Sequence, residues 1–423
     1  MSKIKKRIII HTGPGKTGSS AIQAWLTQNI SFLNENGVFY PQHPLSQEGI
    51  SSGNLHYILE KNNETEKWEV SESKLDHLLG EFNNSDFHSL LLSSEFFFAH
   101  IVKLHALMPD AEYIVYLRHP VELCESNYNQ GIKRHGVIVK FNPPKVIANN
   151  TLKHLEGYFN FVSENLFHLR PYEKSLMVGN NIVSDLLSIL GLECNAEEKT
   201  VNSSFTFPAL EFKRLMNHFG LKGFEQQLDL ALQGCTIGEA KYSLMDEAEF
   251  IRLNTDNCLL MQQFIDSFNF LELQPLQAQF KTVEQRPYKK QQANIEELSS
   301  ILEYVGTVNP DLYSQLTILV RSNPNLIIDN NAIYEAFSVE PSATPKDSLI
   351  STELLNYINK FTVHPGKRGK ICFELGCFYS DSGDLDNALM FAKAAIYFNA
   401  NNMTFRGHLN NLLLEFNAQE QEK

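Results

Sequence analysis

The fold of this chain is decided by Ile8-Ile-Ile-His-Thr-Gly-Pro-Gly-Lys-Thr-Gly-Ser-Ser20. The residues from Arg7 to His11 predict a buried strand, because they form a short β-branched run that Gly and Pro follow at once. A helix is expected after the glycine-rich loop, since Gly37 is a typical helix end and apolar residues recur at helical spacing, at Ile22, Leu26, Ile30 and Leu33. The segment therefore predicts a strand, a loop and one helix in succession.

Further strands and helices alternate over the first half of the chain. Strands are predicted at 38–40, 89–94, 112–117 and 165–169, and helices at 120–134 and 182–190, with weak helices around Leu55 and Leu75. Connections of this length allow crossovers between parallel strands. The fold class expected is α/β, a three-layer domain with a parallel sheet, covered by helices on both faces, and a P-loop-like phosphate-binding turn.

The second half is expected to be all-helical. Strand signals fade after Pro208, and residues 276–294 lie in a polar, Gln-rich stretch that predicts a linker or domain edge. We therefore expect an α/β domain over 1–275 and a helical domain over 295–423. Part of the latter resembles one tetratricopeptide repeat, with Gly383 in the turn, and an ordinary helical hairpin is an equal alternative.

The residues from Gly13 to Ser20 have the composition of an anion-binding loop. Backbone N–H groups at the start of a helix lack partners and carry partial positive charge. Gly13, Gly15 and Gly18 allow tight turns and a close approach of the backbone to a phosphate. Lys16 adds a full charge, and hydroxyl donors are supplied by Thr17, Ser19 and Ser20.

The loop departs from that of the nucleotide triphosphatases. Their pattern, GxxxxGK followed by Ser or Thr, has its lysine directly after the last glycine, whereas this chain has Ser19 there and its lysine at Lys16. The strand at Leu90–Leu92 leads into Ser-Ser-Glu, without the aspartate that helps to hold magnesium in those enzymes. We therefore expect a phosphate ester as ligand and no metal.

At this point the sequence resembles the sulfotransferases that use 3′-phosphoadenosine 5′-phosphosulfate (PAPS), above all their bacterial branch. Their loop for the 5′-phosphosulfate has the form G-x-x-K-S/T-G-S/T-S/T, which Gly13 to Ser20 matches at every position. The resemblance implies PAPS as co-substrate, 3′-phosphoadenosine 5′-phosphate (PAP) as product, and a cofactor-binding role for these loop residues. It also implies Lys16 as a catalytic residue that stabilises charge on the departing phosphate.

A second segment, from Tyr113 to Lys133, supports the same resemblance. Arg118 follows an apolar strand, where open α/β sheets bind ligands, and Ser126 lies eight residues later on the next helix. In the family, an arginine and a serine so arranged bind the 3′-phosphate of the donor. A guanidinium suits that phosphate because it donates two parallel charge-assisted hydrogen bonds.

The acceptor hydroxyl needs a general base, and two residues are candidates. Glu95 is the first, because the strand before it should deliver it to the carboxyl end of the sheet. His56 is the second, because the pKa of an imidazole is ordinarily near neutrality, and related enzymes have similar His-containing segments here. The resemblance implies a glycan or another hydroxyl-bearing molecule as acceptor.

Composition limits the other partners and the location. A formal net charge of −13 argues against bulk nucleic-acid binding. The scattered cysteines form no zinc-ligand pattern, so no metal site is expected. The three isoleucines before His11 are too few for a signal peptide, and no apolar run approaches the roughly 18 residues of a membrane span. We therefore expect a cytoplasmic protein without a transmembrane segment.

Two other functions stay open at this stage. An ATP-dependent small-molecule kinase would bind ATP tightly with magnesium. A non-catalytic interaction protein would have an inert α/β domain of the nucleotide-binding type and would use the helical tail to bind a protein partner or a second copy of the chain.

Overall fold

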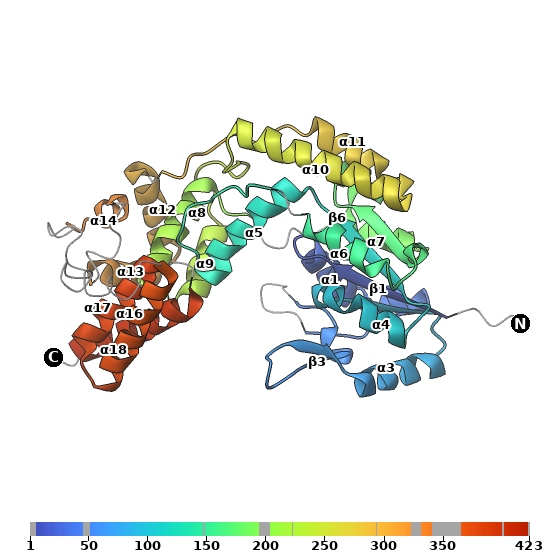
Figure 1. Ribbon diagram of the computed structural model, residues 1–423, viewed down its shortest axis with the longest axis horizontal. Helices are drawn as coiled ribbons and strands as arrows, with labels where there is room; N and C mark the ends of the chain where they lie inside the picture. Colours follow the sequence, from blue (N-terminus) through green and yellow to red (C-terminus); the bar gives the residue numbers. More distant parts are fainter. Residues whose placement is uncertain are drawn as a thin grey trace, which may run out of the picture. The chain divides into compact units, whose positions relative to one another are not determined.

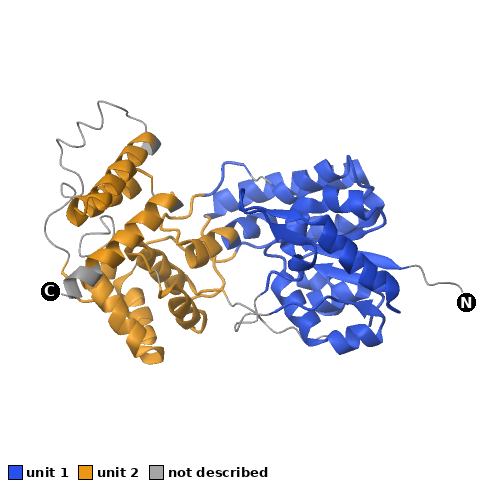
Figure 2. Ribbon diagram, turned by 90° about the horizontal axis from the view of Figure 1, so that it is seen from below, with its two compact units in different colours: residues 1–126, 143–202, 246–285 blue, residues 127–142, 203–245, 286–423 orange. Residues whose placement is uncertain are grey.

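The structure is a computed structural model that describes residues 6–44, 51–146, 149–193, 204–221, 223–292, 294–322, 331–340, 365–399 and 402–421. The chain forms two compact units, coloured separately in Figure 2. Unit 1 consists of Met1–Ser126, Pro143–Asn202 and Asp246–Gln285, and unit 2 of Asn127–Asn142, Ser203–Met245 and Arg286–Lys423. Unit 1 holds the sheets, and the described part of unit 2 is helical.

The main sheet of unit 1 is parallel, as predicted. Its strands lie in the order β2-β5-β1-β6-β7 and span Val38–Phe39, Ser89–Ser93, Arg7–Gly13, Glu112–Leu117 and Phe167–Pro171. The register pairs Ile10 with Leu92 on one side and with Tyr113 on the other. The strand that leads into the glycine-rich loop therefore lies at the centre of the sheet.

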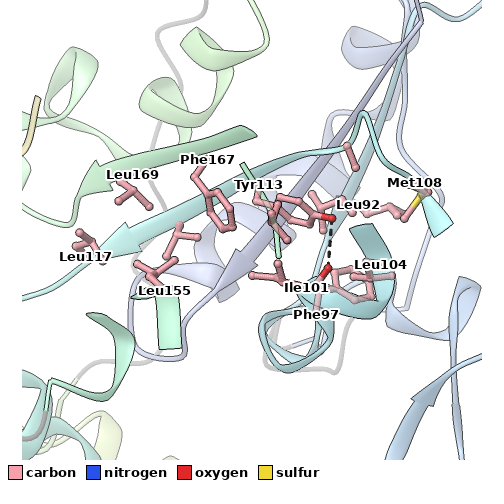
Figure 3. Packing of buried hydrophobic residues seen from close by; sticks show 14 of the residues in the cluster. Leu92, Phe97, Ile101, Leu104, Met108, Tyr113, Leu117, Leu155, Phe167 and Leu169 are labelled. Atoms are coloured by element: carbon pink, nitrogen blue, oxygen red, sulfur yellow. Dashed lines mark hydrogen bonds between the residues drawn. The ribbon is translucent and has the colours of Figure 1, made fainter. Parts of the chain in front are cut away.

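Helices cover both faces of this sheet, which gives the three layers that the alternation predicted. Neighbouring side chains of a strand point to opposite faces. Ile10 accordingly packs with one core, whose members include Leu92, Tyr113 and Phe167 (Figure 3), whereas Ile9 packs with Leu91 and Ile114 in the other. Because all these side chains are buried, the strands read as continuous apolar runs.

The helices of unit 1 divide between these two faces (Figure 1). The first core is completed by α3 (Glu72–Asn84), α4 (Ile101–Leu107), α6 (Asn150–Tyr158), α10 (Glu247–Phe268) and α11 (Gln274–Thr282). The second is completed by α1 (Ser19–Gln28), α2 (Ile30–Glu35) and α7 (Ile182–Ile189). Short 3₁₀ turns are η1 (Leu55–Tyr57), η2 (Glu95–His100), η3 (Glu164–Leu166), η4 (Lys174–Leu176), η5 (Val178–Asn180) and η7 (Leu271–Leu273).

Three local predictions differ from the structure. The single helix expected after the loop is divided into α1 and α2 at Asn29, whose side chain donates to the Trp25 carbonyl. Around Leu55 there is one 3₁₀ turn, η1, followed by the antiparallel strands β3 (Leu59–Lys61) and β4 (Trp68–Val70). Part of the predicted linker is the helix α11, because Leu276 and Phe280 are buried in the first core.

The domain boundaries also differ from those predicted at 1–275, 276–294 and 295–423. Segment 203–245 belongs to unit 2, although it was expected in the α/β domain. Its helices α8 (Phe207–Met216) and α9 (Glu225–Gln233), with the turn η6 (Asn217–Phe219), share one core with α12 (Ile295–Val308), α13 (Pro310–Arg321) and α14 (Ala332–Ala336). Helix α5 (Pro120–His135) begins in unit 1 and ends in unit 2.

Unit 2 ends in three helices, α16 (Pro365–Asp381), α17 (Leu385–Phe398) and α18 (Met403–Gln421). Gly383 forms the turn between the first two with a φ of +78°, as predicted. A Cβ at Gly376 would lie 3.3 Å from the Ala392 nitrogen, so the small residue lets the helices pack closely. Among the described helices, none has both the length and the apolar character of a membrane span.

One buried carboxylate ties β6, β7 and α7 together. Asp185 is fully buried and accepts from Arg170 Nε at 3.0 Å and Nη2 at 2.5 Å, from the Tyr116 hydroxyl at 3.0 Å and from the Val178 nitrogen at 3.0 Å. Removal of one partner of such a pair leaves the other charge and several donors without compensation.

We expect Asp185→Ala to lower the free energy of unfolding by about 3–5 kcal/mol, because Arg170 loses its partner inside the protein. Urea denaturation followed by circular dichroism measures the change. Asp266→Ala is the matched control, since Asp266 is exposed, and its effect should stay within about 0.5 kcal/mol. Equal effects of the two substitutions would contradict the structural role of Asp185.

Candidate functional site

The candidate site lies at the carboxyl edge of the main sheet. The loop Gly13–Ser20 follows β1, Glu95 follows β5, Arg118 follows β6 and Tyr172 follows β7. Since all of these strands are parallel, their carboxyl ends meet at one edge, which is where open α/β sheets bind ligands. The order β2-β5-β1-β6-β7 also places β1 where the chain crosses from one side of the sheet to the other.

The loop has an unusual backbone. Gly13, Lys16 and Gly18 have φ angles of +89°, +69° and +79°. The left-handed conformation costs a residue with a side chain about 1–2 kcal/mol, so Lys16 is strained. Gly18 is the N-cap of α1, and its carbonyl accepts from the Ala21 and Ile22 nitrogens at 3.0 and 3.1 Å. The loop thus leads into the start of α1, and N–H groups at a helix start favour anions.

Two of the loop glycines have side chains of other elements close to them. A Cβ at Gly15 would lie 2.9 Å from Glu95 Oε2. A Cβ at Gly18 would lie 2.6 Å from Ile182 Cδ1 and 3.1 Å from Tyr172 Cε2. The loop therefore packs directly against residues that follow β5 and β7.

Arg118 reaches the same loop. Its Nη1 donates to the Lys16 carbonyl at 2.9 Å, and its Nη2 lies 3.6 Å from Glu122 Oε2. The guanidinium carbon lies 5.4 Å from the centre of the Tyr172 ring. This hydrogen bond holds the strained residue of the loop, which links the second motif of the sequence to the first.

Glu95 lies on the other side of the loop. The residue as a whole is exposed, but its carboxyl oxygen lies against Gly15. Burial of the carboxyl raises the pKa of Glu95 above its usual value, and the positive charge of Lys16 offsets part of this rise. A carboxylate with a raised pKa is a stronger base than an ordinary glutamate.

The hydroxyl groups of the loop have different environments. Thr17 is buried, and its Oγ1 donates to the Pro14 carbonyl at 2.5 Å. Ser19 is buried and Ser20 is half-buried. Ser19 Oγ and Arg118 Nε are buried and make no hydrogen bond within the described part of the chain. Such groups are rare in folded proteins, and both can donate to an anion.

The other two predicted residues lie apart from these contacts. His56 is exposed on η1, and its ring packs edge-on against Trp68, with the ring centres 5.2 Å apart. Ser126 is half-buried, about two turns into α5. The contacts of the structure thus bring Glu95 and Arg118 to the loop, while His56 belongs to a neighbouring aromatic cluster.

Sequence reasoning missed two residues of the site. Tyr172 directly follows β7, so the end of that strand was the signal that could have found it. Gln23 lies four residues after Ser19 on α1 and is buried, and both of its side-chain polar atoms are without a hydrogen bond inside the described chain. Helical spacing places Gln23 on the same face as Ser19.

Comparisons with protein-family models, with curated proteins and with solved structures find no match to this chain. Within the described residues, no group of three or more His, Cys, Asp and Glu side chains is arranged to hold a metal ion.

We expect Lys16→Met to raise the pKa of Glu95 further, because the charge that favours its carboxylate is removed. Carboxyl-carbon NMR of the glutamate-labelled protein follows the titration. Lys103→Met is the control, since Lys103 pairs with Glu72 away from the loop. An unchanged Glu95 titration in Lys16→Met would show that the lysine charge does not act on this carboxyl.

Proposed function

We propose that the chain is a sulfotransferase, which moves a sulfuryl group from PAPS to an acceptor hydroxyl, preferably on a saccharide. The observation that carries the proposal is the contact of both Arg118 and Glu95 with the loop Gly13–Ser20. A phosphate-binding loop, a cation for a second phosphate and a candidate base are then gathered at one sheet edge.

The residues present fit an adenosine bisphosphate. Loop N–H groups at the start of α1 and the Lys16 charge suit the 5′-phosphosulfate. Ser19 Oγ and Arg118 Nε are buried donors that no group of the described chain accepts from, so each can donate to a phosphate oxygen. Arg118 has further N–H groups besides the one that holds Lys16, and a guanidinium suits a 3′-phosphate.

Glu95 and Lys16 have different roles in the proposed reaction. Glu95 takes the proton of the acceptor hydroxyl, and the new bond joins the acceptor oxygen to sulfur. The bond between sulfur and the phosphate oxygen breaks, and PAP leaves with the charge on that oxygen. Sulfuryl transfer resembles phosphoryl transfer, in which alignment and charge stabilisation dominate catalysis. Lys16 and the loop N–H groups supply that stabilisation.

The ligand preference tests the proposal against the two alternatives. Calorimetric titration should show PAP binding without metal, and more weakly bound ATP with or without magnesium. Tight binding that requires both ATP and magnesium would favour a kinase instead. A folded chain that binds neither nucleotide would favour a non-catalytic interaction protein.

Arg118→Ala should lower the affinity for PAP by about 10- to 100-fold, as expected for loss of hydrogen bonds to a charged group. The loss for adenosine 5′-monophosphate should be smaller, since that nucleotide lacks the 3′-phosphate. Calorimetry with both nucleotides measures the difference, and Arg252→Ala on α10 is the control. Equal losses for the two nucleotides would mean that Arg118 only holds the loop.

We expect Lys16→Ala and Glu95→Gln to reduce turnover at saturating PAPS by different routes. Loss of Lys16 should cost about 10²–10³-fold, because its charge matters most as the leaving oxygen becomes anionic. Activity should rise with pH through the raised pKa of Glu95, because the base must be ionised, and Glu95→Gln should abolish that dependence.

Transfer from ³⁵S-labelled PAPS to saccharides of a fractionated cell extract provides the measurement for both variants. Lys103→Ala is the control for loss of a lysine on the same unit. Near-normal turnover of Lys16→Ala would contradict its catalytic role. Full activity of Glu95→Gln with an unchanged pH profile would exclude Glu95 as the base.

A further inference from the structure

Three aromatic rings pack together at the start of η2, the turn that also contains Glu95. His56 on η1 packs against Trp68 on β4, with ring centres 5.2 Å apart, and Trp68 packs against Phe96 on η2, with ring centres 5.9 Å apart. Both contacts are edge-to-face, with interplanar angles of 69° and 64°. We call these three rings the aromatic cluster.

One ring of the aromatic cluster packs against the core of unit 1, and the other two are exposed to solvent. Trp68 is half-buried against the core of unit 1, and Lys61 is its partner across the β3–β4 pair. Phe96 is nevertheless 40% exposed, and His56 is also exposed. A large apolar ring exposed at a candidate active site points to a binding surface.

The position of the cluster relates it to the reaction. Phe96 is the residue directly after Glu95, whose carboxyl oxygen lies against Gly15. The Phe96 ring and the Glu95 carboxyl therefore come from the same turn, η2, at the end of β5. The aromatic cluster lies on the β5 side of the loop Gly13–Ser20. Arg118 and Tyr172 contact that loop from the other side, where they follow β6 and β7.

The exposure of the rings and the charges near them indicate which class of molecule the aromatic cluster binds. Pockets for small apolar ligands are concave and bury most of the ligand, whereas His56 and Phe96 are exposed and only Trp68 is half-buried. Exposed ring edges and faces suit the C–H groups of a sugar, whose hydroxyls stay in water. Residues 60–69 contain four glutamates (Glu60, Glu64, Glu66 and Glu69) against two lysines (Lys61 and Lys67), and this surplus repels an anionic chain.

We propose that His56, Trp68 and Phe96 form the acceptor subsite and hold a neutral saccharide with one hydroxyl at Glu95. The inference rests on the proposed function and specifies its acceptor. It gives His56 the role of a ring contact with the acceptor, in place of the role of base that its sequence also suggested.

Tryptophan fluorescence tests the binding directly, because the chain has only two tryptophans. Trp25→Phe leaves Trp68 as the reporter, and Trp25 packs on Phe32, so a phenylalanine keeps a ring there. We expect cellobiose or N,N′-diacetylchitobiose to change the Trp68 emission in a saturable way. We expect little effect from a hyaluronan tetrasaccharide or from 4-nitrophenol. A saturable response to one of these two compounds, without a response to the neutral disaccharides, would overturn the assignment of a neutral saccharide.

Variants of the cluster separate this inference from the proposed function. Phe96→Ala and Trp68→Ala should weaken saccharide binding and raise the acceptor KM by about tenfold, with Trp68→Phe intermediate. Phe161→Ala is the matched control, since Phe161 is 68% exposed on the same unit and outside the cluster. The affinity for PAP should stay within about twofold in all variants.

The outcomes are distinguishable. If PAP binds and sulfate is transferred, but the cluster variants keep the acceptor KM of the unchanged chain, the acceptor subsite is wrong and the proposed function stands. Absence of any saccharide response of Trp68 in a chain that binds PAP has the same meaning. If PAP itself fails to bind to the folded chain, the proposed function fails first.

Discussion

The parallel pairing of β1 with both β5 and β6 is the constraint on which the site depends. Because the register fixes Ile10 against Leu92 and Tyr113, the three strands end at nearly the same level. Their next residues, far apart in the sequence, are then forced together at one edge. The apolar runs that bury both faces of the sheet therefore also gather the loop Gly13–Ser20, Glu95 and Arg118. The same strands thus determine both the packing of the core and the positions of the candidate site residues.

The loop is held in a conformation that its sequence alone would not favour. Lys16 has a left-handed backbone, which is stable only where neighbouring groups determine it. The hydrogen bond from Arg118 to the Lys16 carbonyl is one constraint of this kind. The packing of Gly18 on Tyr172 and Ile182 is another. The conformation of the loop is thus coupled to the residues after β6 and β7. A change at Arg118 acts on the loop as well as on any ligand, which is why two nucleotides are needed to separate the effects.

The sequence was informative wherever a local pattern determined the structure. The apolar runs of β1, β5 and β6 and the Pro120 start of α5 follow from local rules, and Glu95 follows β5 at the carboxyl end of the sheet, as that strand predicted. The β3–β4 pair was missed because its strands have only three residues each, too few to show an alternating pattern, and are fixed by packing of Leu59, Trp68 and Val70 in the first core. The unit boundaries were missed because α8 and α12 meet in one core although many residues separate them. A contact across such a distance leaves no periodic signal in either segment.

Under the proposed function, the charge of Lys16 acts both on the base that activates the acceptor and on the phosphate that leaves the donor. It lowers the pKa of Glu95 against the rise caused by burial, and it would stabilise the charge that develops on the departing phosphate. A bound donor brings negative charge to Lys16 and so weakens its effect on Glu95. The carboxylate then becomes a stronger base when the donor is in place. A lysine of the proposed phosphate-binding loop, close enough to act on a partly desolvated carboxyl, therefore couples donor binding to acceptor activation, with no movement of the fold required.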